Sequence, residues 1–111
     1  MATLSSHLLN SVNGTHASGV KVIIYQINSS GSKTIFFETE TDDGGRIIKD
    51  FELSSDDCAC EYEMVCKTAD YFSEKKIVSE IIIKFKMEDP KKKYHLPIII
   101  SPNGYSIWWS N

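Results

Sequence analysis

The sequence predicts an all-β sandwich formed by a single domain, residues 1–111. Short runs rich in Val, Ile, Phe, Tyr and Thr recur at intervals of roughly 8–14 residues, and clusters of Gly, Asn, Asp, Ser and Pro separate them. Only the segment 69–76 departs from period-2 alternation in the manner of a helix, of about two turns. A chain of 111 residues can bury roughly 60–65% of its unfolded surface, which is enough for one core.

The first half of the chain contains three expected strands and the start of a fourth: residues 4–10, 20–27, 34–41 and a short strand from 46. Turn-forming residues separate these strands at 13–14, 28–32 and 42–45. We expect 20–27 and 34–41 to pair as a hairpin. Because side chains alternate along a strand, His7 should face away from Leu8, and Ile35, Phe37 and Thr39 should share one face.

The second half begins with an acidic segment, 52–57, for which we expect a loop, and continues with strands at 59–68, 81–87 and 94–100. The turn Ser101-Pro102-Asn103-Gly104 leads into a last, aromatic strand. Alternation on 94–100 predicts that His95, Pro97 and Ile99 face away from the core. On 81–87 it predicts an inward face of Ile81, Ile83, Phe85 and Met87.

The three cysteines, Cys58, Cys60 and Cys66, have the same parity as Tyr62 and Met64, so on one strand all five would face the same way. We expect them to be small buried hydrophobic residues. The alternative is a Cys-x-Cys metal or redox site, but the sequence lacks a second pair at metal-ligand spacing. We therefore expect neither a metal nor a cofactor.

Charge and hydropathy argue against two classes of partner. The net charge is −3, and the one basic run, Lys91-Lys92-Lys93, follows the turn residues Asp89-Pro90, which argues against nucleic acid. No apolar run approaches the length of a membrane span, and the first ten residues lack the pattern of a secretory signal. We expect a cytoplasmic protein. Import into an organelle stays open, although the final Trp109-Ser110-Asn111 differs from the Ser-Lys-Leu peroxisomal signal.

Three residues could perform hydrolytic chemistry if the fold brings them together: His7, Arg46 and His95. A neutral imidazole can take a proton from water, and a second imidazole can relay or donate one. A guanidinium can hold a carbonyl oxygen or a developing oxyanion. This set suits the hydrolysis of a cyclic amide or imide by water, without a metal or a covalent nucleophile.

Four segments, spread over nearly the whole chain, carry a resemblance to a known family: 4–10 (LSSHLLN), 43–46 (DGGR), 68–72 (TADYF) and 94–102 (YHLPIIISP). They are similar to Leu-Ser-Thr-His-Val-Leu-Asp, Asp-Gly-Arg, Thr-Gly-x-Tyr-Phe and Tyr-His-Val-Pro-Leu-Leu-Leu-Ser-Pro of the transthyretin-like proteins, in the same order. Within that family the chain most resembles the 5-hydroxyisourate hydrolases of urate breakdown. The second segment has one extra glycine.

The resemblance implies a transthyretin-like β-sandwich of two four-stranded sheets with one short helix. It implies a homotetramer, a dimer of dimers, with active sites in a channel where the dimers meet. The enzymes of the family have histidine, arginine and histidine at the positions of His7, Arg46 and His95, whereas the hormone-carrying transthyretins lack this set. The resemblance therefore favours a cyclic amide hydrolase, with His7, Arg46 and His95 catalytic and His7 and Arg46 also contacting substrate.

The chain departs from the enzymes at its end, where Trp108-Trp109-Ser110-Asn111 replaces Tyr-Arg-Gly-Ser. Trp108 keeps an aromatic ring that could stack on the substrate, and Asn111 takes the place of a substrate-binding serine. Two alternatives remain. One is a catalytically silent member that binds a small aromatic or hydrophobic ligand in the channel, and the other is a protein-interaction module. Adjacent tryptophans could also serve interface packing.

Overall fold

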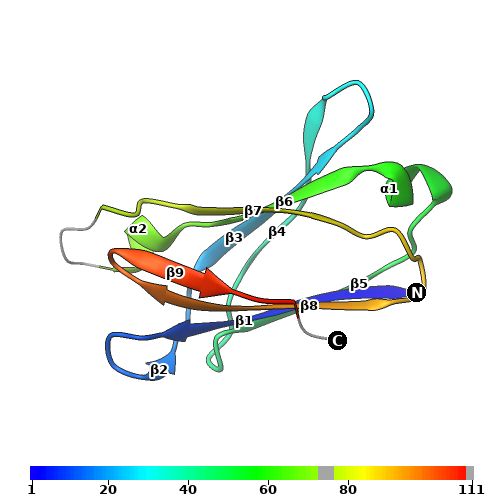
Figure 1. Ribbon diagram of the computed structural model, residues 1–111. Coiled ribbons are helices and arrows are strands. Elements are labelled where there is room, and N and C mark those ends of the chain that lie inside the picture. Colours follow the sequence, from blue (N-terminus) through cyan, green and yellow to red (C-terminus); the bar gives the residue numbers. More distant parts are fainter. Residues whose placement is uncertain (73–76, 110–111) are drawn as a thin grey trace.

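Two β-sheets stack face to face in the computed structural model, which describes residues 1–72 and 77–109 (Figure 1). The first sheet has the order β2-β1-β8-β9, and β5 also pairs with β1. Its strands are β1 (Ala2–Asn10), β2 (Thr15–His16), β5 (Arg46–Phe51), β8 (Lys93–Ser101) and β9 (Gly104–Ile107). The second sheet has the order β4-β3-β6-β7, formed by β3 (Lys21–Ile27), β4 (Lys33–Glu40), β6 (Glu61–Cys66) and β7 (Ile81–Lys86). The predicted sandwich is confirmed.

The core fills the space between the sheets and follows the predicted alternation. On β1 every second residue is buried, including Leu4 and Leu8, whereas Ser5 and His7 lie half-buried on the opposite face. On β8 Leu96 and Ile98 are buried and His95 is half-buried, also as predicted. We call the face of the first sheet that points away from the core its outer face. Because apolar and polar residues alternate along β1 and β8, the histidine side chains of these strands point to the outer face.

The first sheet has one strand more than expected, because β2 extends it. After the turn at Asn13 and Gly14 the chain folds back, so that Thr15 pairs with Asn10 and His16 with Leu9. The Asn13 side chain accepts hydrogen bonds from the backbone N–H and the hydroxyl of Thr15. This two-residue strand places His16 next to β1.

On β4 the expectation that Ile35 and Phe37 share a face is wrong. The register with β3 shifts between Ile24 and Tyr25, because Ile24 pairs with Phe37 but Tyr25 pairs with Ile35. Phe36 is the extra residue of a β-bulge, which reverses the alternation. As a result Ile35 is 56% exposed, while Phe36 and Phe37 both pack against the core.

The acidic segment that we expected to be a loop contains a second short helix, α1 (Ser55–Ala59). A capping box starts it: the Asp57 backbone N–H donates to the Ser54 hydroxyl, and the Ser54 backbone N–H donates to the Asp57 carboxylate. Cys58 lies in this helix and not on a strand, so its predicted alignment with the other cysteines is wrong. Cys60 and Cys66 are buried as predicted, and burial raises the pKa of the Cys66 thiol to about 12.

The predicted helix begins one residue early and is short, α2 (Thr68–Tyr71). The end of its predicted range, residues 73–76, lies outside the described residues. Among the residues that the structure describes, neither helix has the length and apolar character of a membrane span.

The turn between β4 and β5 approaches β1 very closely. Gly45 has a φ of +74°, and a Cβ atom there would lie 2.5 Å from the Leu8 carbonyl oxygen and 3.2 Å from the His16 Cβ. The Gly45 carbonyl accepts the Leu8 N–H at 2.8 Å. Glycine is required here both for its backbone conformation and for the missing side chain.

Replacing this glycine should cost more than its backbone conformation alone explains. Gly14→Ala is a matched control, because Gly14 has a φ of +73° with no atom within 4 Å of an added Cβ. We expect Gly14→Ala to lower the free energy of unfolding by about 1–2 kcal/mol. Gly45→Ala should cost about 1–3 kcal/mol more because the turn must move. Urea denaturation of both variants measures the difference, and equal losses would contradict the close approach.

Candidate active site

The three residues predicted to act together lie on the outer face of the first sheet. Arg46 on β5 is the direct partner of His7 on β1, and His95 on β8 is the partner of Ser5, two residues before His7. Residues two apart on a strand point the same way, so β1 alone brings the two histidines to one face. The structure therefore brings His7, Arg46 and His95 together.

Trp108 lies at the end of the same cross-strand row as Arg46 and His7. His7 pairs with Pro97 on β8, and the Trp108 N–H donates to the Pro97 carbonyl at 3.4 Å. Pro97 has no N–H with which to return this bond, which explains why the β8–β9 pairing ends at Ile107. Three strand spacings separate Arg46 from Trp108, or about 14 Å.

Hydrogen bonds in the turn before β5 fix the backbone position of Arg46. The Asp42 carboxylate accepts the backbone N–H groups of Gly44 and Arg46, each at 2.9 Å, and the Asp42 N–H donates to the Arg46 carbonyl. The Arg46 side chain itself is exposed. Among the ion pairs between described residues none involves its guanidinium, so it is not neutralised by one of them.

His95 is oriented by a hydroxyl group. Its Nδ1 lies 2.8 Å from the Ser5 Oγ, and both side chains are half-buried. A hydroxyl can either donate or accept, so Ser5 can serve His95 in either neutral tautomer. The contact leaves Nε2 of His95 for a substrate or a water molecule.

His16 also belongs to this cluster, and the sequence analysis did not single it out. Its Nδ1 lies 2.9 Å from Nε2 of His7, and the two rings stack with their centroids 5.0 Å apart. The sequence feature that could have revealed His16 is the turn Asn13-Gly14, because a tight hairpin there pairs His16 with Leu9. Leu9 shares the outer face with His7, so the hairpin places both rings on one face.

The surroundings of His7 favour its neutral form. Burial lowers the pKa of His7 below 6.5, and the nearby Arg46 and His16 lower this pKa further. A hydrogen bond to the Gly44 backbone acts in the opposite direction, and His95 makes a smaller contribution that lowers the pKa. A neutral imidazole at neutral pH can accept a proton, which a general base must do.

The two tryptophans line one hollow, and Trp109 also makes its own ring contacts. Trp109 packs on Tyr94 with ring centroids 5.8 Å apart, and the Lys92 ammonium lies 5.2 Å from its ring. With Trp108 it lines a hollow of about 380 Å³ between β7 and the end of β9, together with Phe85, Leu96 and Ile107. Asn111 lies outside the described residues.

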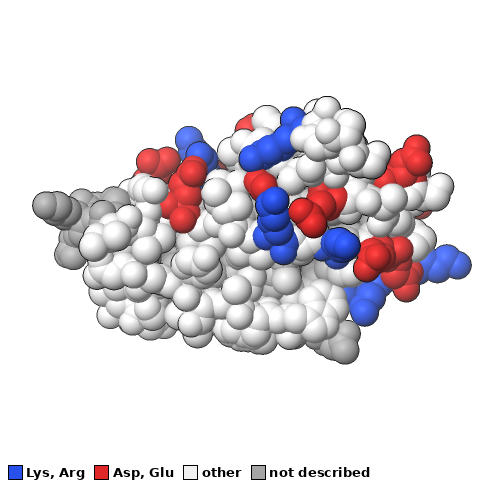
Figure 2. Space-filling model, turned by 45° about the horizontal axis from the view of Figure 1, so that its top comes forward, with Lys and Arg blue, Asp and Glu red and all other residues white. Residues whose placement is uncertain are grey.

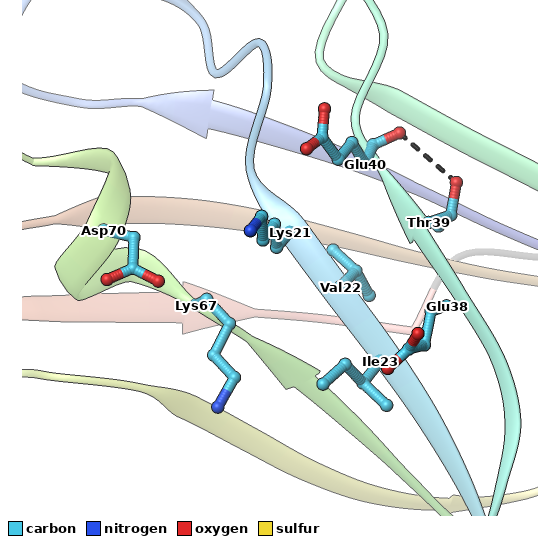
Figure 3. A pocket seen from close by; sticks show the side chains of 8 residues that line it. All are labelled: Lys21, Val22, Ile23, Glu38, Thr39, Glu40, Lys67 and Asp70. Carbon is cyan, nitrogen blue, oxygen red and sulfur yellow. Dashed lines mark hydrogen bonds between the residues drawn. The ribbon is translucent and has the colours of Figure 1, made fainter.

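A second hollow, of about 520 Å³, lies on the other sheet (Figure 3). It is lined by three acidic and two basic side chains, besides Val22, Ile23 and Thr39: Glu38, Glu40, Asp70, Lys21 and Lys67. This mixture of charges does not favour one class of ligand. Among the described residues, no three His, Cys, Asp or Glu side chains are arranged to hold a metal ion.

Comparison with known proteins identifies the family. A sequence model of the HIUase/transthyretin family matches residues 4–109. The chain belongs to this family. The 5-hydroxyisourate hydrolase of Halalkalibacterium halodurans is 27% identical over 112 residues, which cover 95% of this chain and 94% of that protein. That of Salmonella dublin is 32% identical over 108 residues, covering 95% of this chain and 78% of that protein.

Solved structures of the HIUase/transthyretin family share the fold. The 5-hydroxyisourate hydrolase of Klebsiella pneumoniae superimposes with a TM-score of 0.78, 24% identity and 100% coverage of both chains. Transthyretin from Sparus aurata superimposes with a TM-score of 0.85 and 22% identity, covering 96% of this chain and 95% of that one. Both the hydrolase and the transthyretin branches of the family therefore have the architecture described above.

The lowered pKa of His7 predicts how stability depends on pH. The unfolded chain protonates His7 near pH 6.5, whereas the folded protein does so only at lower pH. Between these two values the unfolded state binds more protons, so the free energy of unfolding falls as the pH falls below about 6.5. Urea denaturation at pH 7.5 and pH 5.5 should show a smaller decrease for His7→Gln than for wild type. Identical decreases would show that His7 does not contribute.

Proposed function

We propose that the protein hydrolyses 5-hydroxyisourate in urate breakdown, with His7, Arg46 and His95 as its catalytic residues. The observation that carries the proposal is the placement of these three side chains on one outer face, on β1, β5 and β8. Support also comes from relatives that cover nearly the whole chain and are named 5-hydroxyisourate hydrolases.

In the proposed reaction a water molecule attacks a carbonyl carbon of the cyclic amide. The water gives up one proton, its oxygen forms a bond to the carbon, and the C–N bond of the ring then breaks. His7 is the residue on which the proton from water ends, since its surroundings keep it neutral beforehand. His95, oriented by Ser5, positions the water and relays to the departing nitrogen the proton that His7 has taken up, so that both imidazoles end neutral.

Arg46 and Trp108 would hold the substrate. The Arg46 guanidinium can donate two parallel hydrogen bonds to substrate oxygens and stabilise the oxyanion that forms during attack. Trp108 lies at the other end of the row that starts at Arg46, and its ring can stack on the planar substrate. Asn111 would add a polar contact from the end of the chain.

The proposed site needs a second copy of the chain to enclose it. On the outer face the apolar Ile48, next to Ser5, is 75% exposed. At the β9 edge of the sandwich Tyr105, Trp108 and Trp109 are each about half exposed. Residues 96–111 include no charged side chain. Figure 2 shows a wide uncharged area below the charged groups, while the outer face itself is turned away in that view. Such surfaces are typical of interfaces, which supports a homotetramer, a dimer of dimers, with the site in the channel.

A ligand-binding protein is the second candidate. The hollow lined by Phe85, Trp108 and Trp109 is aromatic and mostly apolar. Such a hollow suits a flat aromatic or hydrophobic molecule. A structure of sea bream transthyretin, which has the same fold, was solved in complex with thyroxine. A silent member of the family would bind such a ligand and leave 5-hydroxyisourate unchanged.

Removing either histidine should abolish most activity without unfolding the protein. We expect His7→Ala and His95→Ala each to lower turnover about a hundredfold or more, because a general acid or base contributes about that much. The assay follows freshly generated 5-hydroxyisourate spectrophotometrically, with circular dichroism as a check of the fold. Lys49→Ala, an exposed residue on β5, is the control and should keep full activity. Undiminished turnover in both histidine variants would remove them from the mechanism.

The assembly can be measured independently of activity. Light scattering at micromolar concentration should give about four chain masses, because the exposed apolar residues favour association. Trp108→Ser and Ile48→Ser should each shift the distribution toward smaller species. A monodisperse monomer for wild type would rule out both the tetramer and a site enclosed by a second copy.

A further inference from the structure

His7 and His16 form a hydrogen-bonded pair of imidazoles on the outer face. Nε2 of His7 lies 2.9 Å from Nδ1 of His16, and the rings are stacked with an angle of 29° between their planes. The pair is built into the fold, since β2 holds His16 beside β1 through the pairing of Leu9 with His16. Gly45 makes room for this arrangement, because any Cβ at that position would lie 3.2 Å from the His16 Cβ.

The contact determines which nitrogen atoms are free. A neutral imidazole has one N–H donor and one lone pair, so a single proton lies between the two rings. Nε2 of His7 is engaged by this bond and cannot at the same time accept a proton from water. The pair therefore has two outer nitrogen atoms, Nδ1 of His7 and Nε2 of His16. His16 is exposed and His7 is half-buried, so Nε2 of His16 is the more accessible of the two.

The groups around the pair favour one direction for the shared proton. The Gly44 backbone forms a hydrogen bond that stabilises protonated His7, so it must accept the proton of Nδ1, the remaining ring nitrogen. With Nδ1 protonated, Nε2 of His7 is the acceptor and His16 is the donor. The charged groups that act on His7 are Arg46 on β5 and, when protonated, His16 on β2 and His95 on β8. In the adjoining turn, Oδ1 of the Asp42 carboxylate accepts two backbone N–H groups.

We propose that His16 is a further catalytic residue, which takes the proton of the attacking water on Nε2 while its own Nδ1 proton passes to Nε2 of His7. This inference rests on the proposed hydrolysis. The water loses one proton and bonds to the carbonyl carbon, and the pair gains one proton in total. His7 ends as an imidazolium whose Nδ1–H donates to the Gly44 carbonyl. His7 is therefore the final acceptor, and His16 is the group in contact with water.

Two substitutions separate the relay from a structural role. His16→Asn retains an amide donor close to the position of Nδ1 but cannot take up a proton, and His16→Ala removes both functions. We expect each to lower kcat about a hundredfold with KM changed less than about twofold, because a proton-transfer group acts in the transition state. Added imidazole should restore part of the kcat of His16→Ala. Val12→Ala, in the turn that leads into β2, is the control and should behave as wild type, because the Val12 side chain is exposed.

A titration without substrate tests the pair independently of the activity. Proton NMR of the ring hydrogens should show a raised pKa of His7 in His16→Asn relative to wild type, because a neighbouring positive charge is removed. Wild-type kcat in His16→Asn would overturn the relay and leave the proposed hydrolysis intact. An unchanged His7 titration in that variant would overturn the pair itself. If wild type fails to hydrolyse 5-hydroxyisourate, both the proposed function and the relay fall, while a raised pKa of His7 in His16→Asn would still establish the pair.

Discussion

The parallel pairing of β1 with β8 is the constraint on which the rest of the structure depends. Eight consecutive residue pairs, from Thr3 with Lys93 to Asn10 with Ile100, join the two ends of the chain in the centre of the first sheet. Both strands bury one face, so a shift of one residue would move the whole apolar set to the outside. This register places Ser5 beside His95, and it makes the outer face continuous from β5 to β9.

Two tight turns then determine the backbone positions of the reactive side chains. The turn that ends at Gly45 approaches Leu8 so closely that only glycine fits, and Arg46 follows directly. The hairpin at Asn13 and Gly14 fixes the backbone position of His16 beside Leu9 in the same way. Both segments pair with β1, so the imidazole pair and the guanidinium are fixed by the same strand. Rigid sheet edges are suitable positions for a site that must hold geometry within fractions of an ångström.

The electrostatic character of the outer face follows from its residue types. One guanidinium and three imidazoles lie together, and the positive charge of Arg46 and the burial of His7 both disfavour a second positive charge. His7 therefore stays neutral and basic near neutral pH, while Arg46 remains charged. That combination can accept a proton and stabilise negative charge in one place.

The sequence by itself determined the sandwich, most strand positions and the faces of His7 and His95. These features follow from the alternation of side chains along a strand, which is local and can be read from the order of residues. It could not reveal the bulge at Phe36, which depends on how β4 meets β3. Nor did it predict the helix after Phe51. That helix has only five residues, and a polar segment of this length forms a loop just as readily unless its capping box forms. Above all, only the tertiary structure decided that His16 touches His7, because that contact requires the hairpin and the glycine turn to meet at β1.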